Sequence, residues 1–225
     1  MKGPRGSILR PAQEAYVERL LPPRDALLAE MEAVSAEEEI ASSDPEVGRL
    51  LEVVARASGA RRIVEVGTAI GYGAICLARG APEARVVTID HDAGRLERAR
   101  GYLERAGVAD RVELLHGPAR EVLAGLEGPV DLAYVDAAKG EYRHCLDLLL
   151  PLLPVGGTLV FDNLLWSGKI AEPPAEDDPD ADALRAFNPY LMIHPQLRAV
   201  MLPLGDGVGL ATKIKPTVRE LGGPF

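Results

Sequence analysis

From Arg62 onward, short β-branched runs alternate with helix-like segments, and this alternation constrains the fold more than any other feature of the sequence. The runs are RIVEV, VVTID, VELLH, DLAYVD and GTLVFD. Strands that alternate with helices form a parallel sheet with helices on both faces. The sequence therefore predicts an α/β fold.

The end of the chain breaks this pattern. LRAVMLPL and VGLATKI are separated only by Gly205, Asp206 and Gly207, which are typical residues of a hairpin turn. Two strands joined so closely must be antiparallel. A parallel sheet that ends in a hairpin differs from dinucleotide dehydrogenases, which usually add another crossover helix.

Residues 1–58 are expected to form a helical N-terminal extension. Apolar residues recur at helical spacing from Ile8 to about Ser58, with interruptions at Pro22-Pro23 and at SSDP, residues 42–45. In SSDPE, a serine or the aspartate could cap a helix that has proline in its first turn. The main unit is expected over residues 59–215 and a tail over 216–225, all in one domain.

One later segment does not fit the alternation of strands and helices. AEPPAEDDPDAD, residues 171–182, is acidic and rich in proline, so it is expected to be a surface loop or lid. A short helix is expected to follow it, around Asp182 to Phe187.

Charge and cysteine content narrow the functional classes. A net charge of -9 and a pI near 5.0 disfavour nucleic acid and anionic membranes as partners. The sequence shows neither an export signal nor a membrane span. Its two cysteines, Cys76 and Cys145, lack metal or redox spacing and are expected to be reduced core thiols. We therefore expect a cytoplasmic protein.

A glycine-bearing loop, VEVGTAIGYG at 64–73, follows the first predicted strand. Glycine lets the backbone approach a ligand closely, but the spacing is not the GxGxxG of a dinucleotide site. The loop also follows an acid, Glu65, which suits a cationic ligand better than a phosphate. S-adenosylmethionine has an amino group and a sulfonium, so Glu65 could order the loop or face the amino acid end of this cofactor. A tight turn without a ligand is the alternative.

The next two predicted strands end in further cofactor candidates. Asp90 ends VVTID, where a carboxylate can accept both hydroxyl hydrogens of a ribose; it could also cap a helix. His91 could flank an adenine or simply be exposed. Gly117-Pro118-Ala119 offers a small, flat surface for the adenine, or a turn before a helix.

Oxygen-bearing side chains end the fourth and fifth predicted strands. Asp136 ends DLAYVD, and Asp162-Asn163 ends GTLVFD. If these strands are neighbours, their ends lie about 5 Å apart and three oxygens converge. Magnesium prefers six oxygens, which would leave room for two adjacent acceptor hydroxyls and one water. A helix cap at Asp136 and a turn at Asp162-Asn163 are the alternatives.

Lys139 lies one turn beyond Asp136 and could reach the same pocket. Near a cation and a sulfonium the protonated form of a lysine would be disfavoured, which suits a general base. The alternative is a solvated lysine.

Taken in order, six segments resemble the cation-dependent O-methyltransferases of the caffeoyl-CoA and catechol type. They are IVEVGTAIGYGA, VTIDHD, AGVADRVELLHGPA, VDAAKGEY, VFDNLLWSGKI and LPLGDGVGLATK. The likeness runs from about Ser42 to Lys215, and VDxxK followed by FDNxLWxG is its most diagnostic pair. It implies a Rossmann-like class I methyltransferase fold: a mostly parallel seven-stranded sheet with a C-terminal antiparallel hairpin and N-terminal helices. It also implies a homodimer.

The resemblance implies S-adenosylmethionine and a divalent cation as cofactors, with magnesium first and manganese or calcium as alternatives. It implies Asp136, Asp162 and Asn163 as cation ligands. The catalytic residues are expected to be Lys139, which would take the acceptor proton, and Asp136. With His91 from the strand pattern, the candidate cofactor contacts are Ser43, Glu65, Gly67, Thr68, Gly73, Asp90, His91, Ala119 and Asp136.

Three residues depart from the family's pattern. Gly73 replaces a usual cofactor-facing serine, Ala138 a frequent aspartate, and Ser167 an asparagine that touches acceptors in plant members.

The implied reaction is methylation of one hydroxyl of a small aromatic diol, catechol-like or caffeoyl-like. Three alternatives remain at this stage. A member of the same family could instead methylate a hydroxylated uridine in transfer RNA. A nicotinamide-dependent oxidoreductase would have no role for the hairpin or for the Asp-Asn pair. A ligand-binding module without catalysis would have no use for Lys139.

Overall fold

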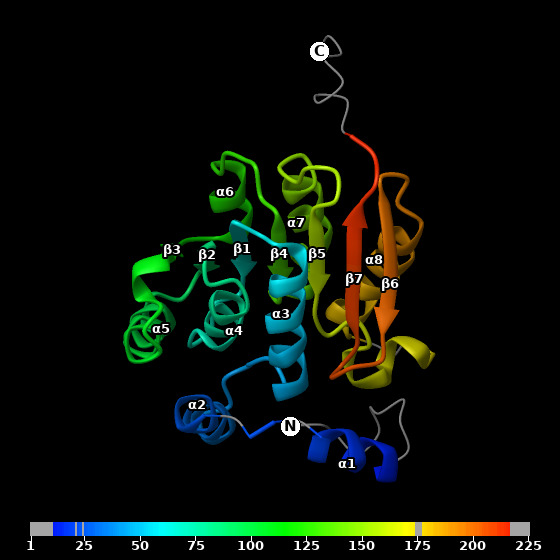
Figure 1. Cartoon of the computed structure of the whole chain (residues 1–225). Coiled ribbons are helices and arrows are strands. Elements are labelled where there is room, and N and C mark those ends of the chain that lie inside the picture. The colour runs from blue at the N-terminus through cyan, green and yellow to red at the C-terminus, as the bar shows by residue number, and fades with distance from the viewer. Residues whose placement is uncertain (1–10, 21, 24, 174–176, 217–225) are drawn as a thin grey trace.

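The computed structural model describes residues 11–20, 22–23, 25–173 and 177–216. Seven strands form one sheet in the order β3-β2-β1-β4-β5-β7-β6 (Figure 1). Their bounds are β1 Arg62–Val66, β2 Arg85–Asp90, β3 Val112–His116, β4 Leu132–Val135, β5 Thr158–Phe161, β6 Leu197–Leu202 and β7 Val208–Lys213. The first five strands are parallel, and β7 is antiparallel to both β5 and β6. The predicted sheet with its terminal hairpin is confirmed.

Helices cover both faces of this sheet, as the alternation predicts (Figure 1). The α-helices are α1 Pro11–Leu20, α2 Ala26–Glu37, α3 Pro45–Ser58, α4 Tyr72–Gly80, α5 Ala93–Arg105, α6 Ala119–Ala124, α7 Tyr142–Leu149 and α8 Pro179–Ile193. Three 3-10 turns, η1 Ala109–Arg111, η2 Lys139–Glu141 and η3 Trp166–Ala171, each lie between a strand and an α-helix.

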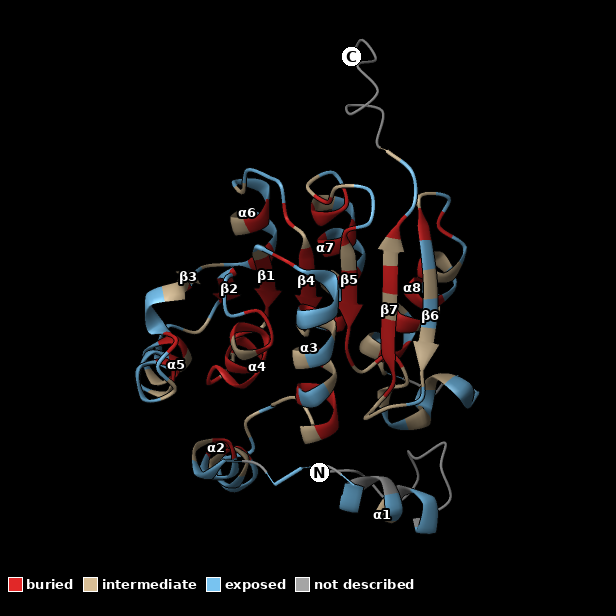
Figure 2. Ribbon diagram, in the orientation of Figure 1, coloured by how far each residue is buried: buried red, intermediate tan, exposed pale blue. Residues whose placement is uncertain are grey.

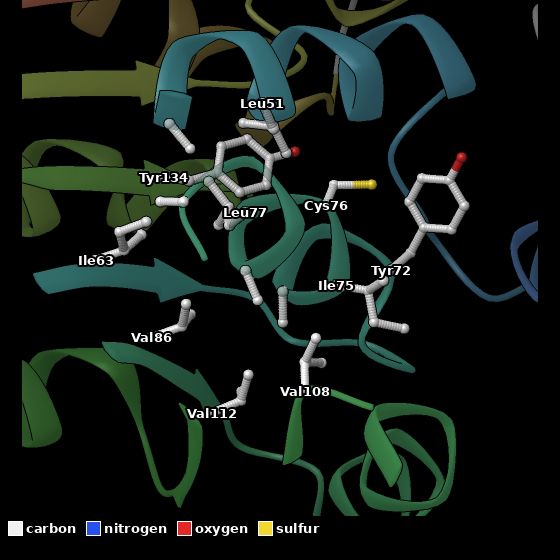
Figure 3. Close-up of a cluster of buried hydrophobic side chains, with 14 of the residues drawn as sticks. Leu51, Ile63, Tyr72, Ile75, Cys76, Leu77, Val86, Val108, Val112 and Tyr134 are labelled. Atoms are coloured by element: carbon white, nitrogen blue, oxygen red, sulfur yellow. The ribbon is translucent and has the colours of Figure 1, made fainter. Parts of the chain in front are cut away.

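Two apolar clusters fill the space between the helices and the sheet. One joins α3, α4 and α5 to the strands, and Figure 3 shows part of it around Leu51, Ile75 and Leu77. The other joins α6, α7 and α8 to the opposite face. The central strands are buried along most of their length because each is covered on both sides (Figure 2). Cys76 and Cys145 lie in these clusters as buried, unbridged thiols, as predicted.

The strand order predicts a crevice at the carboxyl ends of the central strands. From the central pair β1 and β4, the chain continues to β2 on one side and to β5 on the other. Ligands of open α/β sheets bind where the order reverses in this way, beyond the carboxyl ends of the strands. In Figure 1 helix α2 lies beyond these carboxyl ends.

The N-terminal helices are separated at Pro22-Pro23, as the sequence predicts. The second interruption covers residues 38–44, so it begins before the predicted residues 42–45, and Pro45 already belongs to α3. The Asp25 side chain caps α2 by accepting a hydrogen bond from the Leu28 N–H at 2.8 Å. Asp44 occupies the corresponding position before α3 but makes no capping bond with its side chain. Ile8, where the helical pattern was expected to begin, lies outside the described residues, and so does most of the expected tail.

The expected boundary of the helix after the acidic segment is wrong. The helix α8 begins at Pro179, inside that segment, and continues to Ile193, well past Phe187. The Asp178 side chain accepts a hydrogen bond from the Ala181 N–H at 3.0 Å, and proline is tolerated in the first turn because no helical partner is needed there. Acidic residues therefore form the first turn of a helix, where the helix dipole favours them.

Across the described ranges, no helix has both the length and the apolar character needed to cross a membrane.

Candidate active site

A cavity of about 980 Å³ opens at the carboxyl ends of the parallel strands. Its walls come from α2, the loop between α2 and α3, the segments that follow the parallel strands, and Trp166 and Asp180 beyond β5. A smaller cavity of about 60 Å³ lies against the glycine loop. The predicted site residues that line one or both are Ser43, Glu65, Gly67, Thr68, Gly73, Asp90, His91, Ala119, Asp136, Lys139 and Asn163. Asp162 lines neither cavity and is buried behind the wall.

Gly67 shows why the loop needs glycine. It adopts a positive φ of 99°, and a Cβ atom there would overlap the Asp136 carbonyl. The loops after β1 and β4 therefore approach each other through bare backbone. Their contact brings the cofactor candidates of one loop beside the cation candidates of the other.

Asp90 organises the same loop. One carboxylate oxygen accepts from the Ala69 N–H at 2.9 Å, and the other accepts from the Asp92 N–H at 3.0 Å. Each oxygen retains a lone pair that could accept from a ribose hydroxyl. The His91 side chain is 77% exposed, so it lies at the rim of the cavity and does not form its floor.

Glu65 lies beneath the loop, fully buried. Its carboxyl accepts a hydrogen bond from the Thr88 hydroxyl at 2.5 Å, and that hydroxyl contacts the Thr68 hydroxyl at 2.7 Å. Burial raises the pKa of Glu65 to about 8, with the Thr88 hydrogen bond acting in the opposite direction. An amino group placed beside this carboxyl would favour its ionised form. The sequence analysis missed Thr88 because an inward threonine is ordinary in a β-strand.

The departure at Gly73 has a structural reason. A Cβ atom at this position would overlap a Glu65 carboxyl oxygen and would lie 3.2 Å from the Tyr134 ring. The space that a side chain at position 73 would need is therefore occupied by Glu65 and Tyr134.

Two observations suit a polar ligand in these cavities. The hydroxyls of Ser35 and Ser42 are buried and have no hydrogen-bond partner among the described residues. Both serines line the large cavity. Buried polar groups in native proteins are nearly always satisfied, so a ligand with polar groups fits this wall.

The cation candidates converge as expected, since β4 and β5 are neighbours with Val135 paired to Phe161. Asp136 and Asp162 follow these two residues directly. One Asp162 oxygen accepts from the Asn163 N–H at 2.7 Å and the other from the Tyr134 hydroxyl at 2.8 Å. Burial, followed by repulsion from Asp136, raises the pKa of Asp162 to about 7, with the Tyr134 hydrogen bond acting in the opposite direction.

Two close carboxylates and one amide oxygen are a donor set that fits a hard divalent cation. Asn163 adopts a positive φ of 54°, an unusual conformation that asparagine tolerates better than most residues. The described residues contain no metal-holding group of three or more His, Cys, Asp or Glu side chains. A cation here would therefore need the Asn163 oxygen as its third protein ligand.

Lys139, at the start of η2, brings its ammonium into the same group. Its Nζ donates to Asp136 Oδ1 at 3.1 Å, to Asn163 Oδ1 at 2.8 Å and to the Tyr142 hydroxyl at 2.7 Å. The lysine is buried, and its Nζ lies 5.7 Å from the centre of the Trp166 ring. The solvated alternative is wrong. Tyr142 was missed because a tyrosine in a helix pattern resembles any core aromatic residue.

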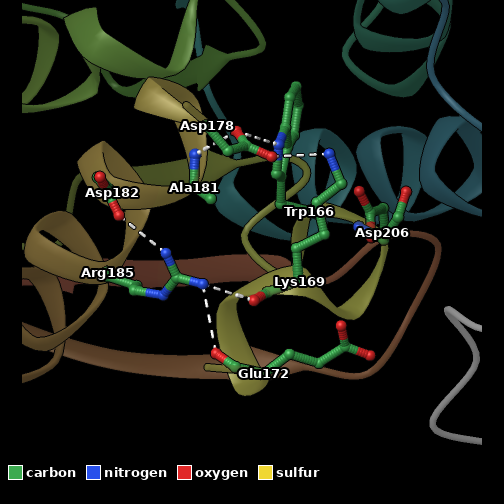
Figure 4. Close-up of polar contacts among 9 residues, drawn as sticks. Trp166, Lys169, Glu172, Asp178, Ala181, Asp182, Arg185 and Asp206 are labelled. Atoms are coloured by element: carbon green, nitrogen blue, oxygen red, sulfur yellow. Dashed lines mark hydrogen bonds and ion pairs between the residues drawn. The ribbon is translucent and has the colours of Figure 1, made fainter. Parts of the chain in front are cut away.

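The wall beyond β5 is held by its own polar contacts (Figure 4). Asp178 accepts from the Trp166 indole N–H at 3.2 Å and from the Lys169 ammonium at 2.7 Å. Ser167 has a positive φ of 54°, and its N–H donates to Asp206 at 2.7 Å. Trp166 and Asp180 line the cavity, whereas the Ser167 side chain is not part of the lining. The acidic segment thus contributes one wall of the site.

A mostly parallel sheet that ends in an antiparallel hairpin, with a cavity above the glycine loop, defines a class I methyltransferase. The O-methyltransferase family model matches residues 23–214. The chain belongs to this family and, as expected, is an S-adenosylmethionine-dependent O-methyltransferase of the caffeoyl-CoA and catechol type.

Individual comparisons agree with this assignment. The chain is similar to a catechol O-methyltransferase of Mycobacterium tuberculosis, with 38% identity over 85% of this chain and 88% of the relative. A caffeoyl-CoA O-methyltransferase of Eucalyptus gunnii is 29% identical over 76% of this chain and 73% of its own length. The crystal structure of a Bacillus cereus O-methyltransferase in complex with SAH matches with a TM-score of 0.80 and 30% identity, covering 90% of this chain and 97% of that one.

Proposed function

We propose that this enzyme methylates one of two adjacent hydroxyls on a small aromatic acceptor and that a divalent cation, magnesium first, assists. The observation that carries the proposal is that Lys139, in the cavity wall, lies within hydrogen-bonding distance of both Asp136 and Asn163. The relatives named catechol and caffeoyl-CoA O-methyltransferase support the aromatic diol.

The cofactor would lie across the glycine loop. Asp90 would accept from the ribose hydroxyls, Glu65 would face the amino group, and Ala119 with His91 would flank the adenine. Ser43, Gly67, Thr68 and Gly73 would form the remaining wall. When bound, S-adenosylmethionine supplies an activated methyl group, and a cation held by Asp136, Asp162 and Asn163 supplies Lewis-acid stabilisation to hydroxyl oxygens.

Lys139 would accept the acceptor's proton at Nζ. In the structure this nitrogen has three oxygen acceptors, so it is arranged as a donor of three hydrogen bonds. To act as a base it must first lose a proton. The Tyr142 hydroxyl donates to the Asp162 carbonyl at 2.8 Å, so it accepts from Lys139 and holds the amine in place. Asp136 would also help to hold the Lys139 amine in place, through its contact with the same nitrogen.

The cavity wall also bears on the acceptor. Trp166 offers an aromatic face, and the neighbouring lining residues Glu141 and Asp180 are acidic. A small aromatic diol suits this wall better than transfer RNA, whose phosphates would require basic contacts. We therefore favour the small acceptor over the RNA alternative.

The remaining expectations belong to the same proposal. The enzyme would act in the cytoplasm as a homodimer, with the helical extension of residues 1–58 and the unit of residues 59–215 in one domain.

The proposal is tested by incubating the protein with labelled S-adenosylmethionine, magnesium and a panel of catechols, caffeoyl esters and undermodified transfer RNA. We expect label on diols. Label on transfer RNA alone, or on no acceptor at all, would contradict it.

A further inference from the structure

The hydroxyl of Tyr134 lies between Ser43, in the loop that joins α2 to α3, and Asp162, one of the cation candidates. It is 2.8 Å from the Ser43 hydroxyl on one side and 2.8 Å from Asp162 Oδ2 on the other. Tyr134 is on β4, its exposed fraction is 1%, and it lines neither cavity. Figure 3 shows its ring among buried apolar side chains, with Leu51 nearby. This buried tyrosine therefore connects Ser43 to Asp162 beneath the cavity wall.

The direction of the hydrogen bonds follows from donor arithmetic. A carboxylate can only accept, as Asp162 must when it acts as a cation ligand. Tyr134 has one hydroxyl proton, so it donates that proton to Asp162 and accepts from Ser43. The three side chains form a directed chain from Ser43 through Tyr134 to Asp162.

We propose that Tyr134 is a positioning residue that couples the Ser43 loop, which joins α2 to α3, to the proposed cation site. This inference rests on the proposed cation function. The Asn163 N–H and the Tyr134 hydroxyl each hold one oxygen of Asp162. They fix the plane of the carboxylate and leave its remaining lone pairs available. Because Ser43 lines both cavities, a ligand that orders its loop also orders the donor to Tyr134.

The packing around the ring supports this role. A Cβ atom at Gly73 would lie 3.2 Å from Tyr134 Cε1, tighter than an ordinary contact. The glycine, near the start of α4, thus leaves room for the tyrosine ring. A hydroxyl held in a packed interior has few alternative partners, so its removal leaves Asp162 and Ser43 each with one fewer partner.

The test measures binding, independently of turnover. The variants are Tyr134→Phe, Ser43→Ala and the double variant, with Tyr190→Phe as the control for loss of a tyrosine hydroxyl outside the two cavities. Manganese affinity is measured by electron paramagnetic resonance of the free ion. SAH affinity is measured by calorimetry with and without manganese. Thermal unfolding reports whether each variant folds.

We expect Tyr134→Phe to weaken manganese binding about tenfold, the scale of one hydrogen bond to a charged group. We expect Ser43→Ala to weaken manganese binding in the wild-type background and to have no further effect in Tyr134→Phe. Manganese should raise the affinity of the wild type for SAH, and this enhancement should shrink in both single variants. Tyr190→Phe should match the wild type.

Different results overturn different claims. Unchanged manganese affinity in Tyr134→Phe, or an equal effect of Ser43→Ala in both backgrounds, would overturn the coupling and leave the proposed cation function intact. If Tyr134→Phe does not fold, Ser43→Ala alone decides, because a structural role of Ser43 in its loop would not change manganese affinity. A wild-type protein that binds no manganese would overturn both claims.

Discussion

The Lys139 ammonium lies 2.8 Å from the Asn163 amide oxygen, which links the proposed base to a proposed cation ligand from the neighbouring strand. The same nitrogen lies 3.1 Å from Asp136 Oδ1. A cation that took these oxygens as ligands would compete with Lys139 for them. The proposed base and the proposed cation site therefore share acceptors, and substitutions must be chosen to separate their effects.

Lys139→Ala should retain the fold and SAH binding while turnover falls about a hundredfold or more, the usual scale for removal of a general base. Initial rates and SAH calorimetry on the same preparation check this. Wild-type turnover in this variant would remove Lys139 from the mechanism.

Lys139→Arg should not restore the rate. A guanidinium supplies positive charge but stays protonated, so it cannot accept the acceptor's proton. Initial rates of Lys139→Arg and Lys139→Ala are compared at equal enzyme concentration. Recovery in the arginine variant would mean that the lysine acts through its charge alone.

Asp90→Asn should weaken SAH binding by about 1.5–3 kcal/mol, because hydrogen bonds to a charged acceptor are lost on the cofactor side. Asparagine keeps one acceptor oxygen for the loop, which alanine would not. Asp92→Asn is the matched control, because Asp92 caps α5 and asparagine caps equally well. Calorimetry should show a loss only at position 90, and equal affinities would contradict the ribose assignment.

SAH affinity should rise with pH between about 6.5 and 8 and should depend on Glu65. The pKa of the buried carboxyl is raised to about 8, so without ligand it is mostly neutral at pH 7. A cationic amino group favours the carboxylate, so binding releases a proton and is favoured as pH rises toward 8. Calorimetry in two buffers of different ionisation enthalpy should reveal this proton. Glu65→Gln should abolish the pH dependence, and a persistent slope would show that another group titrates.

Gly73→Ala should lower SAH affinity about tenfold while the protein still folds, because the new Cβ displaces the Glu65 carboxyl. Gly101→Ala is the control, since a Cβ there meets nothing within 4 Å and lies on the exposed side of α5. Affinity that is unchanged in Gly73→Ala would show that Glu65 does not contact the cofactor.

Most of the fold could be predicted from local patterns. Alternating β-branched runs and the Gly205–Gly207 turn identify a parallel sheet with a final hairpin because both signals are confined to a few residues. The start of α8 was missed because an acidic, proline-rich stretch has loop composition, and only the Asp178 capping bond shows that a helix begins there.

The buried residues that support the site were harder to predict than the residues that line the cavity. Asp136, Lys139 and Asn163 could be identified because chemistry-bearing residues follow predicted strands. Tyr134 and Tyr142 could not, since their hydroxyls bond to Asp162, which lies 28 and 20 positions away in the sequence. Nothing in the spacing of a strand tyrosine distinguishes a connecting hydroxyl from ordinary core packing.

Initial rates on a caffeate-type diol and its coumarate-type mono-phenol, with magnesium and with chelator, test the central claim most directly. Asp136, Asp162 and Asn163 would leave adjacent cation positions that only two neighbouring hydroxyls can fill together. We expect the diol to react at least about a hundredfold faster, because misplacement of the attacking oxygen by about 1 Å costs that much. Chelator should abolish the reaction, and Asp162→Ala should have the same effect without chelator. Equal rates on both acceptors, or full activity in chelator, would contradict a cation-assisted mechanism.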